Sequence, residues 1–431
     1  MNLNSDNIFV GREMLEIKKE CTGCMACVNS CPVSAIQITE DKYGFLMPEI
    51  MQDKCINCDM CLRVCPIENV PGSPDKSREN ISVPLEAWSM YHKSEEVVSI
   101  SSSGGAFYGL AEKVLEREGI VFGCFYDIIQ KKAYLTDTDH VTLQDLLTSK
   151  YVESAVGKDG FQKVEKELKR GREVLFCGTP CEAAGLRKYL SRNDTGSGVD
   201  NGSIEGDYEN LLIVDFACGG VAAQPYLSAY LTSLEEKYES KISDMSFRDK
   251  HYGWGQYCFT AQFENGEIYR KTAMSDPYFF CFLRSSMQRL SCHGCIFADD
   301  HKSDICLSDF WKCDFFDIDR NDRKGLSLAL AFSKKGIWKI HELKDIMHMQ
   351  SIPVKDASYH LKGRFCPPEK LEEIYRDMTT AYVDGVEVLR NRLLTEEQKD
   401  YYDRRQQIMD DEGEAKNHPE IVGNGQIMSK S

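Results

Sequence analysis

The chain contains two cysteine runs of identical spacing, CTGCMACVNSC at residues 21–31 and CINCDMCLRVC at residues 55–65, and a proline follows each run. Both runs read C-x2-C-x2-C-x3-C-P. Two-residue gaps wrap a tight loop around one inorganic cube, so that three thiolates reach three irons, whereas the fourth cysteine points away toward another cube. Zinc sites instead favour separate C-x2-C pairs. The spacing therefore predicts two [4Fe–4S] clusters rather than zinc ions.

The spacing also predicts which cysteines share a cluster. The first cysteine set is Cys21, Cys24, Cys27 and Cys65. The second cysteine set is Cys55, Cys58, Cys61 and Cys31. Between the runs, AIQITEDKYGFLMPEI indicates two short strands joined by a turn. Residues 14–70 resemble a bacterial dicluster ferredoxin, so we expect an α+β ferredoxin-like domain over residues 1–75. Such a domain carries single electrons and needs a partner site elsewhere.

Composition excludes several classes of protein. The 431 residues are 42% hydrophobic and 28% charged, which is typical of a soluble globular chain of two or three domains. With 52 Lys and Arg against 68 Asp and Glu, the net charge is 52 − 68 = −16, which disfavours nucleic-acid binding. No window reaches the roughly 18 apolar residues of a transmembrane helix. Nineteen cysteines without an apolar export signal indicate a reducing, cytoplasmic location.

The chain after the cysteine runs predicts an α/β region. Residues 71–84, rich in proline and polar residues, indicate a linker. Strand patterns such as IVFGCFYD, EVLFCGTP and LLIVDFACGG then alternate with helical patterns. This alternation predicts an α/β domain with a mixed, largely parallel sheet. The stretch from about residue 394 is helical and charged, and we expect residues 411–431 to be disordered.

Two polar segments could bind an anion. The sequence SISSSGG at residues 99–105 precedes a helix, where backbone N–H groups and the helix dipole can hold a phosphate, although a plain serine N-cap explains it equally well. In SFRDKHYGWGQY, Arg248 and Lys250 lie among aromatic residues, and SDFW follows at residues 308–311. This combination suits a planar anionic cofactor or substrate, whereas an ordinary polar loop is the simpler interpretation.

Several cysteines beyond the two runs are candidates for a third metal site. Cys181 follows a tight turn at a helix start, where it could be a nucleophile, a ligand or an inert buried thiol. Cys292 and Cys295 form a single C-x2-C, which is half of a metal site. Cys181 and Cys218 follow predicted strands and could complete it. The third cysteine set is therefore Cys181, Cys218, Cys292 and Cys295. The competing cysteines are Cys177, Cys281, Cys306 and Cys313, of which Cys306 fits a core position better.

Taken in order, these segments resemble the beta-subunit family of coenzyme F420 hydrogenase/dehydrogenase. The resemblance spans about residues 85–365 and rests on SSSGGAFYGLAEKVLEREGIVFG, TSKYVES, VLFCGTPCEAAGL, VDFACGGV, FRDKHYGW, DPYFFCFL, SCHGC and SDICLSDFW. It implies a catalytic region with an N-terminal part at 85–170 and a C-terminal part with the third cluster at 171–365, followed by a helical tail at 366–431. It also implies FAD, an adjacent iron–sulfur cluster, and hydride exchange with a small molecule, which is F420 in archaeal members.

The resemblance assigns roles to individual residues. The serine–glycine turn would hold the phosphate region of the flavin; it comprises Ser102, Ser103, Gly104 and Gly105. Ser149, Lys150 and Tyr151 match the SKY stretch, in which Lys150 would hydrogen-bond the flavin ring and stabilise its anionic reduced form. Arg248 and Lys250 are further candidate cofactor contacts. The chain departs from the family at Gly219, where histidine is usual, and at Glu182, where glutamine is common.

The sequence therefore predicts an oxidoreductase that passes electrons between ferredoxin-type clusters and a hydride-exchanging substrate through FAD. Its expected partners are a ferredoxin-type carrier or a larger redox complex, and a small hydride donor or acceptor. One alternative is an electron-transfer subunit without its own catalysis. Another is a thiol enzyme with Cys181 as nucleophile, although no recognisable motif supplies it with a base.

Overall fold

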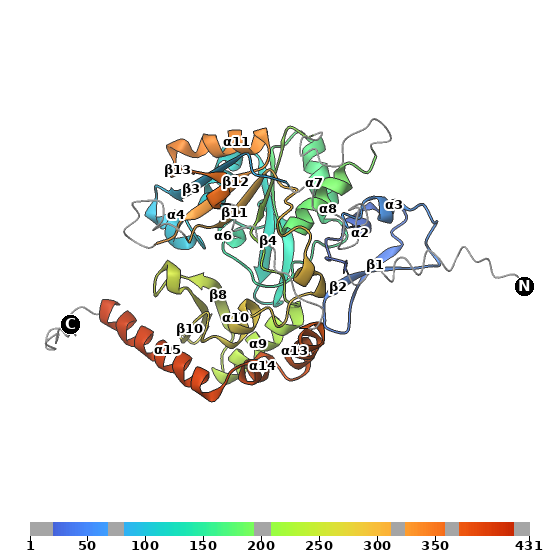
Figure 1. Ribbon diagram of the computed structural model, residues 1–431. Helices are drawn as coiled ribbons and strands as arrows, with labels where there is room; N and C mark the ends of the chain where they lie inside the picture. Colours follow the sequence, from blue (N-terminus) through green and yellow to red (C-terminus); the bar gives the residue numbers. More distant parts are fainter. Residues whose placement is uncertain (1–19, 68–81, 194–207, 312–323, 358–369, 418–431) are drawn as a thin grey trace, which may run out of the picture.

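The computed structural model describes residues 20–67, 82–193, 208–311, 324–357 and 370–417. A small N-terminal unit, blue in Figure 1, lies beside helices α7 and α8 of the main body. Its elements are α2 (Ala26–Ser30), β1 (Ile36–Glu40), β2 (Leu46–Ile50) and α3 (Met60–Arg63). Strands β1 and β2 pair antiparallel, as the sequence predicted, and Asp41 Oδ1 closes their turn by accepting the N–H groups of Tyr43 and Phe45.

The main body is built on a mixed sheet in the order β13-β3-β12-β11-β7-β6-β4-β5. Its strands are β3 (Glu86–His92), β4 (Ile120–Asp127), β5 (Lys132–Asp137), β6 (Val174–Cys177), β7 (Leu211–Phe216), β11 (Ile305–Asp309), β12 (Ser327–Ala331) and β13 (Met347–Ile352). The central strands β11, β7, β6 and β4 are parallel to one another, and the outer strands pair antiparallel. The predicted mixed α/β sheet is thereby confirmed.

Helices cover both faces of this sheet because its central strands are apolar on both sides. They are α4 (Glu95–Ile100), α5 (Ala106–Leu115), α6 (Leu143–Leu146), α7 (Gly160–Lys169), α8 (Pro180–Leu190), α11 (Lys334–His341), η4 (Glu342–Asp345) and α12 (Val354–Ala357). On β4, Ile120 and Phe122 pack with α7, α8 and the N-terminal unit, whereas Val121 packs with α5 on the opposite face. The N-terminal unit therefore shares a hydrophobic core with one face of the sheet.

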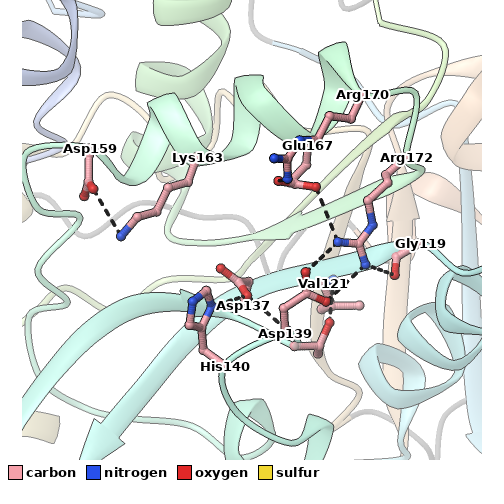
Figure 2. Close-up of polar contacts among 11 residues, drawn as sticks. Gly119, Val121, Asp137, Asp139, His140, Asp159, Lys163, Glu167, Arg170 and Arg172 are labelled. Atoms are coloured by element: carbon pink, nitrogen blue, oxygen red, sulfur yellow. Dashed lines mark hydrogen bonds and ion pairs between the residues drawn. The ribbon is translucent and has the colours of Figure 1, made fainter.

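Charged residues fasten the end of α7 to the sheet, as Figure 2 shows. The guanidinium of Arg172 donates to both carboxylate oxygens of Asp139 at 2.6 and 3.1 Å, and to the carbonyl of Gly119 at 3.1 Å. The α7 residue Glu167 lies 3.4 Å from the same guanidinium. These contacts fix α7, and with it the surface on which the N-terminal unit lies.

A second layer of helices and strands forms the lower half of the molecule in Figure 1. It contains α9 (Gln224–Lys237), β8 (Ile242–Asp249), η1 (Trp254–Gln256), β9 (Cys258–Phe263), β10 (Ile268–Thr272), α10 (Pro277–Leu283), η2 (Leu290–Gly294), α13 (Leu371–Val383), α14 (Val386–Leu393) and α15 (Glu396–Asn417). An aromatic core joins this layer, and the hairpin tip of the N-terminal unit reaches it through Phe45, whose ring lies edge-on to Tyr226.

Residues 394–417 bear out the expected helical character, and α15 continues through residues 411–417, which were expected to be disordered. The remaining tail residues, 418–431, and most of the expected linker lie outside the described residues. Among the described helices, none combines the length and the apolar character needed to cross a membrane.

Candidate iron–sulfur and cofactor sites

The two cysteine runs fold into loops of the same shape. In the first run, Gly23 and Met25 have φ values of 76° and 59°, and at the matching positions of the second run, Asn57 and Asp59 have 53° and 56°. Left-handed backbone at two alternate residues curls each loop tightly, which turns its three leading cysteines toward one point. A short helix, α2 or α3, begins just before the third cysteine of each run and ends before the fourth.

The second cysteine set surrounds one cavity. The cysteines that line this cavity are Cys31, Cys55, Cys58 and Cys61. The apolar side chains around them are Ile36, Ile50, Ile56 and Met60. Cys31 thus crosses from the first run to the second, as the spacing predicts. Four convergent thiols in an apolar hollow are the donor set that a [4Fe–4S] cluster requires.

The first cysteine set also converges. Burial raises the pKa of the Cys27 thiol well above its usual range; Cys21 and Cys65 raise it further, and Cys61 of the second set does so to a smaller extent. Cys65, from the second run, therefore lies with the first run. Burial likewise raises the pKa of Cys24, followed by smaller contributions from Cys27 and Cys181. Crowded thiols that repel one another's negative charge fit the positive irons of a cluster.

The third cysteine set comes together from three separate segments. Burial raises the pKa of Cys218, and Cys292, Cys181 and Cys295 raise it further, in that order. Cys181 lies in the first turn of α8, with its Sγ 3.1 Å from the hydroxyl of Thr179. Its neighbour Glu182 closes a capping box with Thr179, which fixes the helix start and orients the thiol.

The competing cysteines do not join this third set in the same way. Cys281 is buried in the aromatic core against the carbonyl of Val386. The pKa of Cys177 is raised by burial to about 12 and is influenced by Asp215 and Lys150. Cys306 is fully buried in the sheet, as predicted for a core residue. Cys313 lies outside the described residues.

The first and third sets are neighbours. Thr22, between the first two cysteines of the chain's first run, hydrogen-bonds the thiol of Cys181. Gly185, one turn further along α8, lies against Cys24, and a Cβ at this glycine would be only 3.0 Å from the Cys24 sulfur. The glycine therefore allows α8 to approach the first cysteine loop closely. Cys24 is buried at this contact, and the other cysteines of the two sets are partly buried.

The segments expected to hold a flavin also converge. Ser149 donates its backbone N–H to Ser102 Oγ at 2.9 Å, which joins the SKY stretch to the serine–glycine turn. Arg248 is buried, and it donates to the Tyr151 hydroxyl at 3.2 Å and to the Ser102 carbonyl at 3.3 Å. Its main partner is Asp309 of SDFW, which accepts two hydrogen bonds at 2.9 and 3.1 Å. Three sequence motifs therefore meet at one guanidinium.

The serine–glycine turn is packed closely against the sheet. A Cβ at Gly104 would lie 2.4 Å from the Met90 carbonyl, and Gly105 has a φ of 88° immediately before α5. Both positions therefore require glycine. Ser103 Oγ donates to the Leu326 carbonyl, and Lys250 donates to the carbonyls of Val98 and Ser103 at 2.7 and 2.8 Å. Lys250 thus braces the turn itself.

A polar cavity opens beside this turn. The hydroxyl side chains that line it are Ser99, Ser101, Thr148, Ser246 and Thr260, and the charged ones are Asp244, Arg248, Asp249 and Lys250. Aromatic side chains lie nearby: the Arg248 guanidinium is 4.1 Å from the Tyr257 ring centroid, and Trp254 stacks on Trp311 at 4.3 Å. The predicted combination of cations and aromatic rings is therefore present at this place.

Lys150 points toward its own loop. Its amine donates to the carbonyl of Asp145 at 3.0 Å and to that of Leu147. Burial lowers its pKa, while Cys124 and Cys177 oppose this effect. A cofactor ring would reach this amine only if it replaced those carbonyl contacts.

Sequence reasoning missed two buried polar groups. In one, His301 Nδ1 lies 2.9 and 2.8 Å from the carboxylate oxygens of Asp215, and its Nε2 lies 4.0 Å from Cys306 Sγ. All three residues are fully buried. In the other, Arg289 pairs with Glu153 at the boundary of the N-terminal unit. No motif joins the members of either group, although an apolar strand interrupted by Asp215 was a visible signal.

Comparison with known families agrees with this geometry. Residues 20–69 match the 4Fe-4S dicluster domain, so the N-terminal unit is an iron–sulfur electron-transfer module. Residues 171–356 match the C terminus of the coenzyme F420 hydrogenase/dehydrogenase beta subunit. Both halves of the resemblance inferred from the sequence are thereby confirmed. Together the two matches support an iron–sulfur redox electron-transfer protein whose residues 171–356 are similar to the C terminus of that beta subunit.

A comparison with curated proteins finds no match. Among solved structures, one similar chain comes from the F420-reducing [NiFe] hydrogenase complex of Methanosarcina barkeri, studied by xenon derivatization. The two chains are 12% identical, the alignment covers 72% of this chain and 92% of the other, and the TM-score is 0.42.

Proposed function

We propose that this chain is an iron–sulfur flavoprotein oxidoreductase with three [4Fe–4S] clusters and one FAD. The observation that carries the proposal is the convergence of the third cysteine set directly beside the first. Helix α8 carries Cys181 of the third set, and its Gly185 packs so closely on the first set that a Cβ there would lie 3.0 Å from the Cys24 sulfur. Electron transfer between two clusters requires that they lie close together. A storage or structural role for the cysteines would not require the two sets to be neighbours.

The second cysteine set would be the terminal that meets a redox partner. Cys58 is exposed, and its neighbour Ile56 is 60% exposed. The first set lies further inside, and the third set lies among the loops after β6 and β7. Electrons would therefore pass from the second cluster to the first and then to the third, or in the opposite direction.

The polar cavity would hold FAD, and the third cysteine set would hold the cluster that supplies single-electron chemistry beside it. A flavin supplies the conversion of a two-electron hydride into single electrons. Arg248, fixed by Asp309, would offer a permanent positive charge to the cofactor, and the turn around Ser102 would line its phosphate region. Lys150 would donate a hydrogen bond to the ring after releasing its loop carbonyls. The four-thiol sets and the Arg248 site fit these cofactors chemically.

The hydride donor or acceptor would be coenzyme F420 or another small organic molecule. The match to an F420-linked beta-subunit family supports this substrate class. The same match supports assembly with other redox subunits or a ferredoxin-type carrier.

Iron and flavin content test the proposal. Anaerobically reconstituted protein should contain about twelve irons and about one flavin per chain. Cys218→Ser should lose about four irons, because the third cluster loses one ligand. Cys281→Ser is the matched control, since Cys281 is a buried thiol outside every set, and it should keep all the iron. About eight irons in the unsubstituted chain, without flavin, would refute the proposal.

A second candidate is an electron-transfer subunit without its own catalysis. Exposure of Cys58 in the second cysteine set supports this candidate as much as the first, because either protein must meet a redox partner. Reduction of an artificial dye by reduced F420, with the isolated chain as the only protein, distinguishes the two. A thiol enzyme based on Cys181 is tested by the same iron count, because Cys218→Ser would then lose no iron.

A further inference from the structure

A buried ion pair lies between the first and third cysteine sets. The side chains of Arg289 and Glu153 are 4% and 5% exposed. One end of the Arg289 guanidinium donates to the Cys21 carbonyl at 3.2 Å, and the other donates to the Leu46 carbonyl at 2.8 Å and pairs with Glu153. A single side chain from the α/β region therefore binds two separate backbone segments of the N-terminal unit.

Glu153 completes the same clamp. Its second carboxylate oxygen accepts the N–H of Leu46 at 3.0 Å, so both polar backbone groups of Leu46 are bound by the pair. The backbone N–H of Glu153 donates to the Ala222 carbonyl at 2.8 Å, close to the third set. Burial raises the pKa of Glu153, while Arg289 lowers it. Burying either charge alone would cost much free energy in lost hydration, and the attraction between the two charges offsets that cost.

Arg289 is also bonded through its backbone to the loop of the third set. Its N–H donates to the Val221 carbonyl and its own carbonyl accepts the N–H of Cys292, both at 2.9 Å. Ser291, between them, donates to the same Cys21 carbonyl at 3.1 Å. The guanidinium thus contacts a first-set cysteine, and the backbone of the same residue contacts a third-set cysteine.

The first cysteine loop leaves room for this arginine only because of Gly23. A Cβ at Gly23 would lie 2.7 Å from the nearer guanidinium nitrogen, and its φ of 76° also favours glycine. The cysteine loop and the guanidinium are therefore fitted to each other. If the N-terminal unit were joined to the α/β region only by a flexible linker, this close fit would not be needed.

We infer that Arg289, held by Glu153, is a positioning residue that fixes the first cluster against the third and makes both clusters easier to reduce. The inference rests on the proposed function, because it requires a cluster at each set. An arginine keeps its charge throughout the working pH range. A fixed positive charge near a cluster favours the added electron, and net charge is one of the factors that set cluster potentials. The nearby carboxylate of Glu153 partly cancels this effect.

Two substitutions at the pair should therefore shift the potentials in opposite directions. Arg289→Gln removes the positive charge and should lower the reduction potentials of the first and third clusters, with at least a threefold fall in the ratio of reduced to oxidised cluster at a fixed applied potential. Glu153→Gln keeps the hydrogen-bonding shape but removes the negative charge, and should raise that ratio at least threefold. A clamp that only holds the fold would not produce shifts of opposite sign.

The experiment is an anaerobic redox titration of the full chain, followed by electron paramagnetic resonance. Arg289→Lys keeps the positive charge but loses the two-ended hydrogen bonding of the guanidinium. It should leave the reduction potentials unchanged. After mixing with dithionite, it should slow electron transfer from the second cluster toward the third at least threefold. Arg192→Gln is the matched control, because Arg192 pairs with Glu165 at 2.8 Å within the main body. It should leave potentials and rate unchanged.

The outcomes separate this inference from the proposed function. About twelve irons in every variant, with no shift or with shifts of the same sign for Arg289→Gln and Glu153→Gln, would overturn the inference alone. About eight irons in the unsubstituted chain would overturn the proposed function first. If Arg289→Gln fails to fold, the sign of the Glu153→Gln shift and the rate of Arg289→Lys decide the matter.

Discussion

The hydroxyl of Thr22 hydrogen-bonds the thiol of Cys181, across the boundary between the first cysteine run and helix α8. The contact joins residues from opposite sides of the boundary between the two regions that match different families. A dicluster module and a beta-subunit region are therefore joined by more than a linker. Val28 and Ile36 of the first region share a hydrophobic core with Phe176 and Ala183 of the second, which makes the two regions one body.

With the proposed third cluster in place, Thr22→Val should lower the reduction potential of that cluster alone. The substitution preserves shape but removes a hydrogen bond to a ligand sulfur, and such bonds raise cluster potentials. Iron content should remain at about twelve per chain. Redox titration followed by electron paramagnetic resonance measures the shift. Thr39→Val, in the hairpin of the N-terminal unit, is the control; an equal shift there would show that the effect is not local.

Asn29→Ala should loosen the N-terminal unit. The Asn29 amide donates to the carbonyls of Met25 at 3.0 Å and Gly157 at 3.1 Å, and its oxygen accepts the N–H of Phe161 at 3.0 Å. Loss of these buried bonds should cost about 2–4 kcal/mol in the free energy of unfolding. Denaturant unfolding measures this cost, and limited proteolysis should release the N-terminal unit more readily. Gln37→Ala removes only an exposed bond and should change little; equal effects of both would contradict the role of Asn29.

With FAD bound at the Arg248 site as proposed, Arg248→Lys should weaken flavin binding by about 10- to 100-fold, which corresponds to roughly 1.5–3 kcal/mol for a charged hydrogen bond in a fixed geometry. Lysine cannot form the two-pronged contact with Asp309 and also reach Ser102. Flavin fluorescence after denaturation measures the retained cofactor. Arg284→Lys, at the end of α10 beside Phe280, should retain flavin fully. Full retention in Arg248→Lys would place the cofactor elsewhere.

The buried His301 predicts a pH-dependent stability. Burial is the largest single influence and lowers the pKa of His301, but the charge and hydrogen bond of Asp215, together with contributions from the Ala298 backbone and Asp300, raise that pKa above 6.5. A folded-state pKa above the unfolded one gives a stabilising contribution that is complete below about pH 6.5 and is lost as the pH rises through the raised value. His301→Gln should therefore cost most stability near pH 6 and progressively less at higher pH.

Denaturant unfolding at pH 6, 7.5 and 9 checks this expectation. His140→Gln is the control, because His140 is exposed and contacts Asp137 at 2.7 Å, as Figure 2 shows. Its cost should be small at each pH. A cost of His301→Gln that grows with pH would mean that the buried imidazole is neutral in the folded chain.

Local spacing allowed the grouping of the cysteines to be predicted, because each C-x2-C-x2-C run encodes its own loop. Even the exchange of Cys31 into the cavity of the second run followed from the wider gap and the proline. The central parallel strands were also visible as apolar runs alternating with helices. Antiparallel outer strands such as β12 and β13 were not, since only the three-dimensional fold decides which edge a strand joins.

The buried charged groups could not be predicted for a different reason. Arg289 and Glu153 are 136 positions apart, and His301 and Asp215 are 86 positions apart. A charge in a sequence is read as a surface residue unless its partner is known. Lys150 shows the opposite difficulty. Its motif suggested an amine that is free to bind a cofactor, whereas in the fold this amine donates to two backbone carbonyls.

Strand β3 has a consequence for how the protein is made. It lies between β12 and β13, and Ser89 of β3 meets Gln350 of β13, which follows it by 261 positions. At about 5–20 residues per second, a ribosome needs roughly 10–50 seconds to deliver that partner. For most of this interval the nascent chain carries β3 with neither neighbouring strand synthesised, so this part of the sheet can close only late in synthesis.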